Sequence, residues 1–127
     1  MVIHESEVET LDLPGRTLKW LIHPDQKISE KFSLNTVTIK SGETVKPAHS
    51  HPDDEEVIYV VSGEGKVMID SAVYSIRAGS VILFPQGSIH MVRNSGSMDM
   101  KLICFFTSPV SLANYMFHKD IPFPEDK

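Results

Sequence analysis

Three histidines and one glutamate stand at spacings that suit a metal site. His49 and His51 are separated by one residue, Glu56 follows shortly after, and His90 comes much later in the chain. Residues i and i+2 of a strand point to the same face, so an extended segment brings His49 and His51 together. Imidazole nitrogens and a carboxylate are the usual ligands of first-row divalent metals. Such a set fills four positions, and a six-coordinate metal keeps two more for water, dioxygen or substrate.

The elements that must position these residues are expected to be short β-strands. Gly, Pro, Asn, Asp and Ser recur along the chain and separate runs rich in β-branched and aromatic residues, which is typical of an all-β sandwich or barrel. No segment shows apolar residues at helical period, so we expect little helix, at most one turn near 109–115. The predicted strands are 32–40, 55–61, 65–70, 72–77, 80–84, 90–94 and 100–106, with a further strand through 44–51 that Pro47 and Pro52 interrupt.

Composition limits the class of protein. The chain has 127 residues and a net charge of −5, enough for one core and without the basic stripe that nucleic-acid binding needs. No apolar stretch approaches the roughly 20 residues of a membrane span, and no signal peptide is recognisable. The single cysteine, Cys104, forms no internal disulfide, which fits a cytoplasmic protein.

Three segments are predicted. Residues 1–31 form an N-terminal segment with an edge strand near 18–22, residues 32–107 form the β-barrel, and residues 108–127 form a tail. The tail is too apolar for a solvated end, so we expect it to pack on the barrel or on a second subunit. The apolar N-terminal strand and the aromatic tail together favour a homodimer.

With these residues in place, the sequence resembles the cupin superfamily in its small single-domain microbial form. The first cupin motif corresponds to Gly42, His49, His51, Glu56 and Gly63, and the second to Gly79, Pro85, Gly87, His90 and Asn94. Every spacing of the second motif is met. The first motif departs once, because the gap between Gly42 and His49 is one residue longer than usual, which leaves the shape of that loop open.

The resemblance implies a double-stranded β-helix, or jelly roll, that holds one divalent transition metal near a barrel mouth. The implied ligands are His49, His51, Glu56 and His90. Of the two adjacent glutamates, only Glu56 has the family distance to Gly63. The metal is left open among Fe, Mn, Ni, Cu, Co and Zn, since ligands of this type suit all of them.

Strand alternation predicts the residues that line a pocket. Lys101 should face solvent, so its neighbours in the last strand should face inward. The predicted lining is Ile58, Val60, Leu102, Cys104 and Phe106. Cys104 is otherwise a small buried hydrophobe. The acidic run before Glu56 is interpreted as a solvated loop whose last member alone turns inward, with an acid–base role for Asp53 or Asp54 as the alternative.

The function favoured by this reasoning is a metal-dependent enzyme that acts on a small organic molecule. An oxygenase is preferred, because the open metal positions accept both a chelating substrate and dioxygen, and Glu56 is a candidate base. Isomerase, lyase or decarboxylase chemistry is the nearest alternative. A non-catalytic barrel that binds a small molecule is the second class, and turnover in proportion to the metal loaded distinguishes it from an enzyme.

Overall fold

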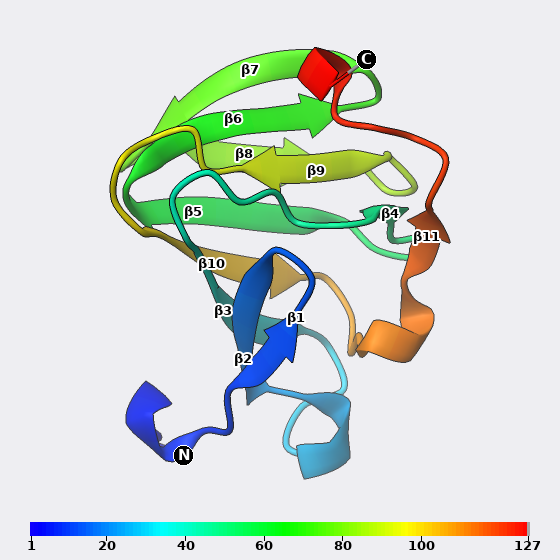
Figure 1. Cartoon of the computed structure of the whole chain (residues 1–127). Helices are drawn as coiled ribbons and strands as arrows, with labels where there is room; N and C mark the ends of the chain where they lie inside the picture. The colour runs from blue at the N-terminus through cyan, green and yellow to red at the C-terminus, as the bar shows by residue number, and fades with distance from the viewer. Residues whose placement is uncertain (127) are drawn as a thin grey trace.

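The chain folds into two antiparallel β-sheets packed face to face, and the computed structural model describes residues 1–126 (Figure 1). The larger sheet has the order β1-β2-β3-β10-β5-β8, with β1 (Leu11–Leu13), β2 (Arg16–Ile22), β3 (Ser33–Ile39), β10 (Met100–Phe106), β5 (Glu56–Ser62) and β8 (Val81–Phe84). The smaller sheet has the order β11-β4-β9-β6-β7, with β11 (Met116–His118), β4 (Ala48–Ser50), β9 (His90–Arg93), β6 (Glu64–Ile69) and β7 (Ala72–Arg77). The predicted all-β jelly roll is confirmed.

Helical structure in residues 1–126 is limited to short 3₁₀ turns, as expected. They are Glu5–Glu7, Pro24–Gln26, Leu112–Asn114 and Pro124–Asp126. The turn at Leu112–Asn114 falls where a single turn was predicted. In this same part of the chain, no helix combines the length and apolar character needed to cross a bilayer.

Alternation along the central strands explains the core. In β10 the side chains of Met100, Leu102, Cys104 and Phe106 are buried, while those between them face outward or lie half-buried. The neighbouring β5 buries Glu56, Ile58 and Val60 in the same phase. The inward residues of both sheets meet in one main hydrophobic core.

The N-terminal hairpin extends the larger sheet. β2 pairs with β3, and its alternate residues Arg16, Leu18 and Trp20 are buried, so this strand belongs to the barrel wall. The turn before it requires glycine, because Gly15 has a φ of +78° and a Cβ there would lie 1.8 Å from the Thr44 carbonyl oxygen. β1 was not predicted, since three residues are too few to show a period.

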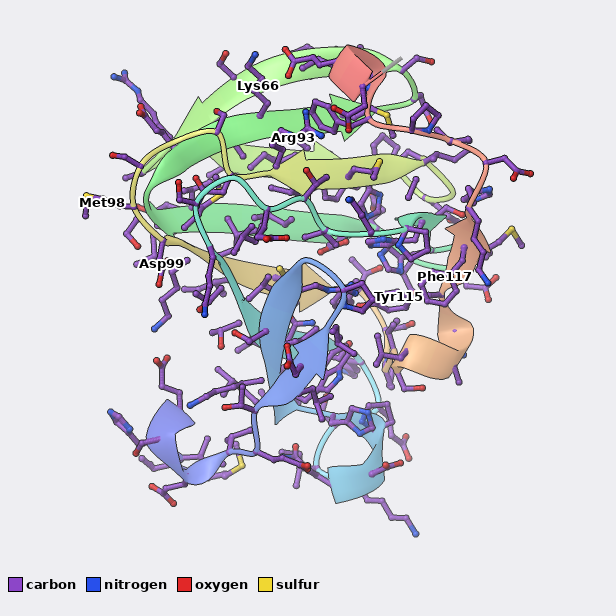
Figure 2. All side chains as sticks on the ribbon, viewed as in Figure 1. Lys66, Arg93, Met98, Asp99, Tyr115 and Phe117 are labelled. Carbon is purple, nitrogen blue, oxygen red and sulfur yellow. The ribbon has the colours of Figure 1, made fainter. Side chains whose placement is uncertain are left out.

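The C-terminal segment runs from the Leu112–Asn114 turn past β11 and β4 towards β6 and β7 (Figure 1). β11, which was also not predicted, pairs with β4. Further on, the ring of Phe123 is buried, and the Arg93 guanidinium lies 4.1 Å from its centre. Lys66 and Arg93 (both labelled in Figure 2) form ion pairs with Glu125, and Arg93 also pairs with Asp126.

The outer face of the larger sheet carries exposed apolar side chains over β10, β5 and β8. The strand register places Ile103, Tyr59 and Val81 in one row across β10, β5 and β8. Phe105, Val57 and Leu83 form the next row. Five of these six side chains are exposed, and the tyrosine hydroxyl is their only polar group.

Candidate metal centre

The four predicted ligands come together at one point between the two sheets. Ligand atoms of His49, His51, Glu56 and His90 all lie within 4.8 Å of one another, and all four side chains are buried. In the smaller sheet His49 of β4 pairs directly with His90 of β9, and His51 follows just after the end of β4. Glu56 comes from the larger sheet, as the first residue of β5. Both sheets therefore contribute to the cluster.

A tight turn delivers His90 to the cluster. The Ser88 amide donates to the Pro85 carbonyl at 3.0 Å, and Gly87 between them has a φ of +78°, which is the left-handed conformation that a type II turn requires. The Gly87 amide also donates to the carbonyl of His51 at 3.0 Å, which ties the turn to the other histidines. Beyond the turn, the ring of His90 stacks on Phe84 with centres 3.7 Å apart.

Asn94 fixes the far end of the same strand through its side-chain amide. Its side-chain Nδ2 donates to the carbonyls of Ile39 at 2.8 Å and Met98 at 2.7 Å. Its Oδ1 accepts from the Gly96 amide at 2.9 Å. The second motif thus holds β9 at both ends.

Backbone carbonyls orient two of the imidazole rings. His49 Nδ1 lies 3.3 Å from the Pro47 carbonyl oxygen, and His90 Nδ1 lies 3.2 Å from that of Ser88. A carbonyl accepts from an N–H, so each contact favours the tautomer with the proton on Nδ1 and a free lone pair on Nε2. Burial, and then the neighbouring His90, hold the pKa of His49 well below its ordinary value, so this ring is neutral.

Four atoms of the cluster are buried and lack hydrogen-bond partners: His51 Nδ1, His51 Nε2, His90 Nε2 and Glu56 Oε1. His51 Nε2 and His90 Nε2 lie 3.0 Å and 3.2 Å from Glu56 Oε1, but neither pair is aligned as a hydrogen bond, and all three atoms are buried. Burial raises the pKa of Glu56, but the two nearby rings outweigh it and bring the net value well below the ordinary range. The carboxylate is therefore ionised.

This donor set fits a divalent transition metal. Two atoms bound about 2.1 Å from one metal at right angles lie about 3.0 Å apart, which matches the two contacts of Glu56 Oε1. Buried polar atoms without partners are costly in a protein interior, and a shared cation removes that cost. Neutral imidazoles and an ionised carboxylate are the protonation states that metal binding requires.

A small cavity of about 40 Å³ opens beside the cluster. Ile58, Leu102 and Cys104 line it, while Val60 and Phe106 are buried elsewhere in the core. Phe106 instead packs edge-on against the ring of His51, with ring centres 4.9 Å apart.

Three polar residues of this cavity were not among those predicted from sequence: Arg16, Asn35 and Tyr115. Alternation could have found the first two, because Arg16 is in phase with the buried Leu18, and Asn35 with the buried Val37. No sequence signal marks Tyr115. It follows the last 3₁₀ turn before β11 (Figure 2), and its ring lies over His49 and His51 at centre distances of 5.1 Å and 4.4 Å.

The acidic run behaves differently from its interpretation as a solvated loop. Asp53 and Glu55 are exposed, but Asp54 is buried and accepts a hydrogen bond from the Ser108 hydroxyl. This contact anchors the loop to the segment that follows β10. None of these three acids lines the cavity, so the structure gives no support for an acid–base role of Asp53 or Asp54.

A jelly-roll barrel with three histidines and one glutamate between its sheets is typical of one family of small β-barrel proteins. Comparisons with known proteins identify the same family. The cupin domain family matches residues 35–106, and the chain belongs to this family. An uncharacterised protein of Methanocaldococcus jannaschii is 27% identical over 97 residues, covering 76% of this chain and 77% of that protein. A Streptomyces cyaneus protein named polyketide synthase CurC is 27% identical over 123 residues, covering 97% and 79%.

The fold is also found in solved structures. A predicted oxalate decarboxylase from Thermotoga maritima superposes with a TM-score of 0.76 at 20% identity, covering 85% of this chain and 99% of that one. At this level of identity the likeness concerns the fold. It places the chain among cupin barrels of similar size.

Proposed function

We propose that this protein is a metal-dependent enzyme that acts on a small organic molecule, with oxygenase chemistry as its reaction. The observation that carries the proposal is the convergence of four buried ligand atoms, three of them without hydrogen-bond partners, beside a cavity. His49, His51, Glu56 and His90 would hold one divalent metal. A closed structural site would have no adjoining cavity, so the arrangement favours a reactive centre.

A bound metal of this kind supplies Lewis acidity and open positions for a chelating substrate and dioxygen. The side chains around the cavity supply the remaining functions. Ile58 and Leu102 form apolar walls that exclude water from the reacting atoms. Glu56 borders the cavity and is the candidate base for a substrate proton, although its lowered pKa makes the carboxylate a weak base.

A lyase or decarboxylase is the second candidate, supported by a proton-bearing group in the cavity. Burial, and then the charge of Glu56, raise the pKa of Tyr115 well above its ordinary value, so its hydroxyl keeps its proton at neutral pH. A protonated hydroxyl at the cavity wall is suited to donate to a carbanion. The Thermotoga maritima protein bears the name predicted oxalate decarboxylase, which agrees with this class. A barrel that binds a ligand without turnover is the non-catalytic alternative.

Elemental analysis of untagged protein, together with oxygen uptake on a panel of small enols and carboxylates, tests the proposal. We expect about one metal per chain, lost in His49→Ala and His90→Ala and retained in the matched control His4→Ala, whose ring is exposed and outside the cluster. Oxygen uptake in proportion to the metal loaded supports the oxygenase, and substrate loss without oxygen uptake supports the lyase. Saturable binding without turnover would leave the non-catalytic barrel, and wild-type protein that takes up no metal would refute the proposal.

We also propose that the protein is a homodimer. The support differs from what the sequence suggested, because β2 and Phe123 are buried within one chain. The exposed apolar rows on β10, β5 and β8 are the better candidate, since contiguous apolar surface of this kind is typical of subunit interfaces.

A further inference from the structure

The cavity beside the ligand cluster contains a buried cation without a counter-anion. Arg16 lines the cavity and is only 8% exposed. Among residues 1–126, no carboxylate lies within ion-pairing distance of its guanidinium. Lys66, Arg93 and Lys101, by contrast, each form an ion pair with a carboxylate. The ionised Glu56 lines the same cavity and partly compensates this charge, but it forms no ion pair with the guanidinium.

The hydrogen bonds of Arg16 leave one edge of the guanidinium free. Its Nη1 donates to the carbonyl oxygens of Pro14 and Lys46, each at 3.1 Å, which uses both hydrogens on that nitrogen. In the described part of the chain, Nε and Nη2 have no hydrogen-bond partner. These two nitrogens form the planar fork that binds a carboxylate through two parallel hydrogen bonds.

Asn35 adds a second polar group of the same kind. It lines the same cavity, is 1% exposed, and its Oδ1 accepts no hydrogen bond. It lies on β3 and pairs with Trp20 of β2, four residues along that strand from Arg16, so the two polar groups reach the cavity from different points of its wall. A buried amide oxygen without a donor is a site for a hydroxyl group of a ligand.

The charges of the cavity also favour an anion. Glu56 carries one negative charge, whereas Arg16 and a bound divalent metal would together carry three positive charges. A small anion reduces this excess, and a carboxylate that reaches both the Arg16 fork and the metal reduces it most effectively. A neutral molecule leaves the excess unchanged.

We propose that Arg16 and Asn35 form the substrate-recognition subsite of this cavity, and that they select a small hydroxy- or enol-carboxylate. The free edge of Arg16 binds the carboxylate, and the Asn35 amide oxygen accepts a hydrogen bond from the hydroxyl or enol. The inference rests on the proposed function in one respect, because the bound molecule is held against the metal of the His49, His51, Glu56 and His90 cluster. A purely structural Arg16, which only joins the Pro14 and Lys46 carbonyls, is the competing explanation.

Nuclear magnetic resonance of the arginine side chains distinguishes the two. Glycolate is the probe, and neutral glycolamide is its matched control. Each is titrated into zinc-loaded protein and into metal-free protein while the Nε–H signals of Arg16, Arg77 and Arg93 are followed. We expect glycolate to shift the Arg16 signal saturably and to leave that of the exposed Arg77 in place. Glycolamide at the same concentrations is expected to shift neither.

Variants add a second readout. Arg16→Lys keeps the charge but loses the fork, so glycolate affinity should fall at least roughly tenfold while zinc content stays the same. Arg77→Lys is the matched control and should bind as wild type. Asn35→Ala should weaken glycolate more than acetate, which has no hydroxyl. A merely structural Arg16 would lower thermal stability without this dependence on ligand charge.

The outcomes separate this inference from the proposed function. Unchanged glycolate affinity in Arg16→Lys, or equal binding of glycolamide, would overturn the subsite even if zinc binds as proposed. Wild-type protein that binds no zinc would refute the metal centre, and the metal-free titration would still decide whether Arg16 binds a carboxylate. Where Arg16→Lys fails to fold, the wild-type titration alone decides, because absence of an Arg16 shift contradicts the proposal.

Discussion

Metal removal should destabilise the protein, because the ligand cluster that would bind the metal exists only in the folded chain. The four ligands are adjacent only in the folded chain, because His90 is distant in sequence from His49 and His51 and comes from a different strand. Unfolding separates them, so the metal binds the native state far more tightly than the unfolded state. By linkage, free metal at 100 times its dissociation constant stabilises the native state by about 2.7 kcal/mol.

This free energy converts to a change in melting temperature. An unfolding entropy of about 2.1 cal/mol/K per residue gives a chain of 127 residues about 0.27 kcal/mol/K, so 2.7 kcal/mol corresponds to a shift of about 10 °C. The assay is differential scanning calorimetry of chelator-treated protein, with and without added zinc or manganese. We expect the shift to grow with the logarithm of free metal concentration.

The ligand variants make the reasoning refutable. His90→Ala removes one donor and leaves the other three, so the metal-dependent shift should shrink to less than half. His4→Ala should retain the whole shift, since this ring lies outside the cluster. A shift of equal size in the His90→Ala variant would mean that the metal binds elsewhere, and the four-ligand centre would then be wrong.

Three further predictions concern thiol reactivity, packing and assembly. Burial, and then the Glu56 charge, raise the pKa of Cys104 well above its ordinary value, so the thiolate fraction stays negligible at pH 8. Ellman's reagent should therefore label Cys104 only after unfolding, and rapid labelling of the native protein would contradict this burial. Phe123→Ala should cost about 3–5 kcal/mol, because the ring is fully buried, and a melting temperature within about 2 °C of wild type would show that the tail adds little to stability. Light scattering should show that the wild-type protein is a dimer and that the Leu83→Lys variant is a monomer. The Lys119→Ala variant, changed at an exposed position outside the apolar rows, should remain a dimer. A monomeric wild-type protein would refute the interface.

The barrel could be predicted because its strands show their period. Met100, Leu102, Cys104 and Phe106 alternate with outward residues, and the glycine and proline punctuation between strands is dense. β1 and β11 escaped prediction because each has three residues and depends on a partner strand for its hydrogen bonds. The strand through 44–51 contracts to Ala48–Ser50, since Pro47 has no amide hydrogen to donate to a ladder.

The convergence of the four clustered side chains could be predicted because their spacings match the two cupin motifs. His49, His51, Glu56 and His90 lie close to strand ends or turns whose residues are visible in the sequence, such as Pro85 and Gly87. The cavity wall was only partly predictable, because Tyr115 reaches it through an irregular tail whose path has no periodic signal. The burial of Asp54 depends on Ser108, a contact between distant segments that no local pattern announces.

The cavity wall has one consequence for how such proteins diverge. The residues that would hold the metal all lie inside the family segment 35–106, whereas Arg16 and Tyr115 reach the cavity from either side of it. The residues that would hold the metal and part of the proposed recognition subsite therefore occupy separate stretches of the gene. Mutation of the flanks can change which molecule enters without touching the ligands, so two relatives with the same motifs can process different compounds. Exchange of these flanks between relatives is accordingly a direct route to altered selectivity.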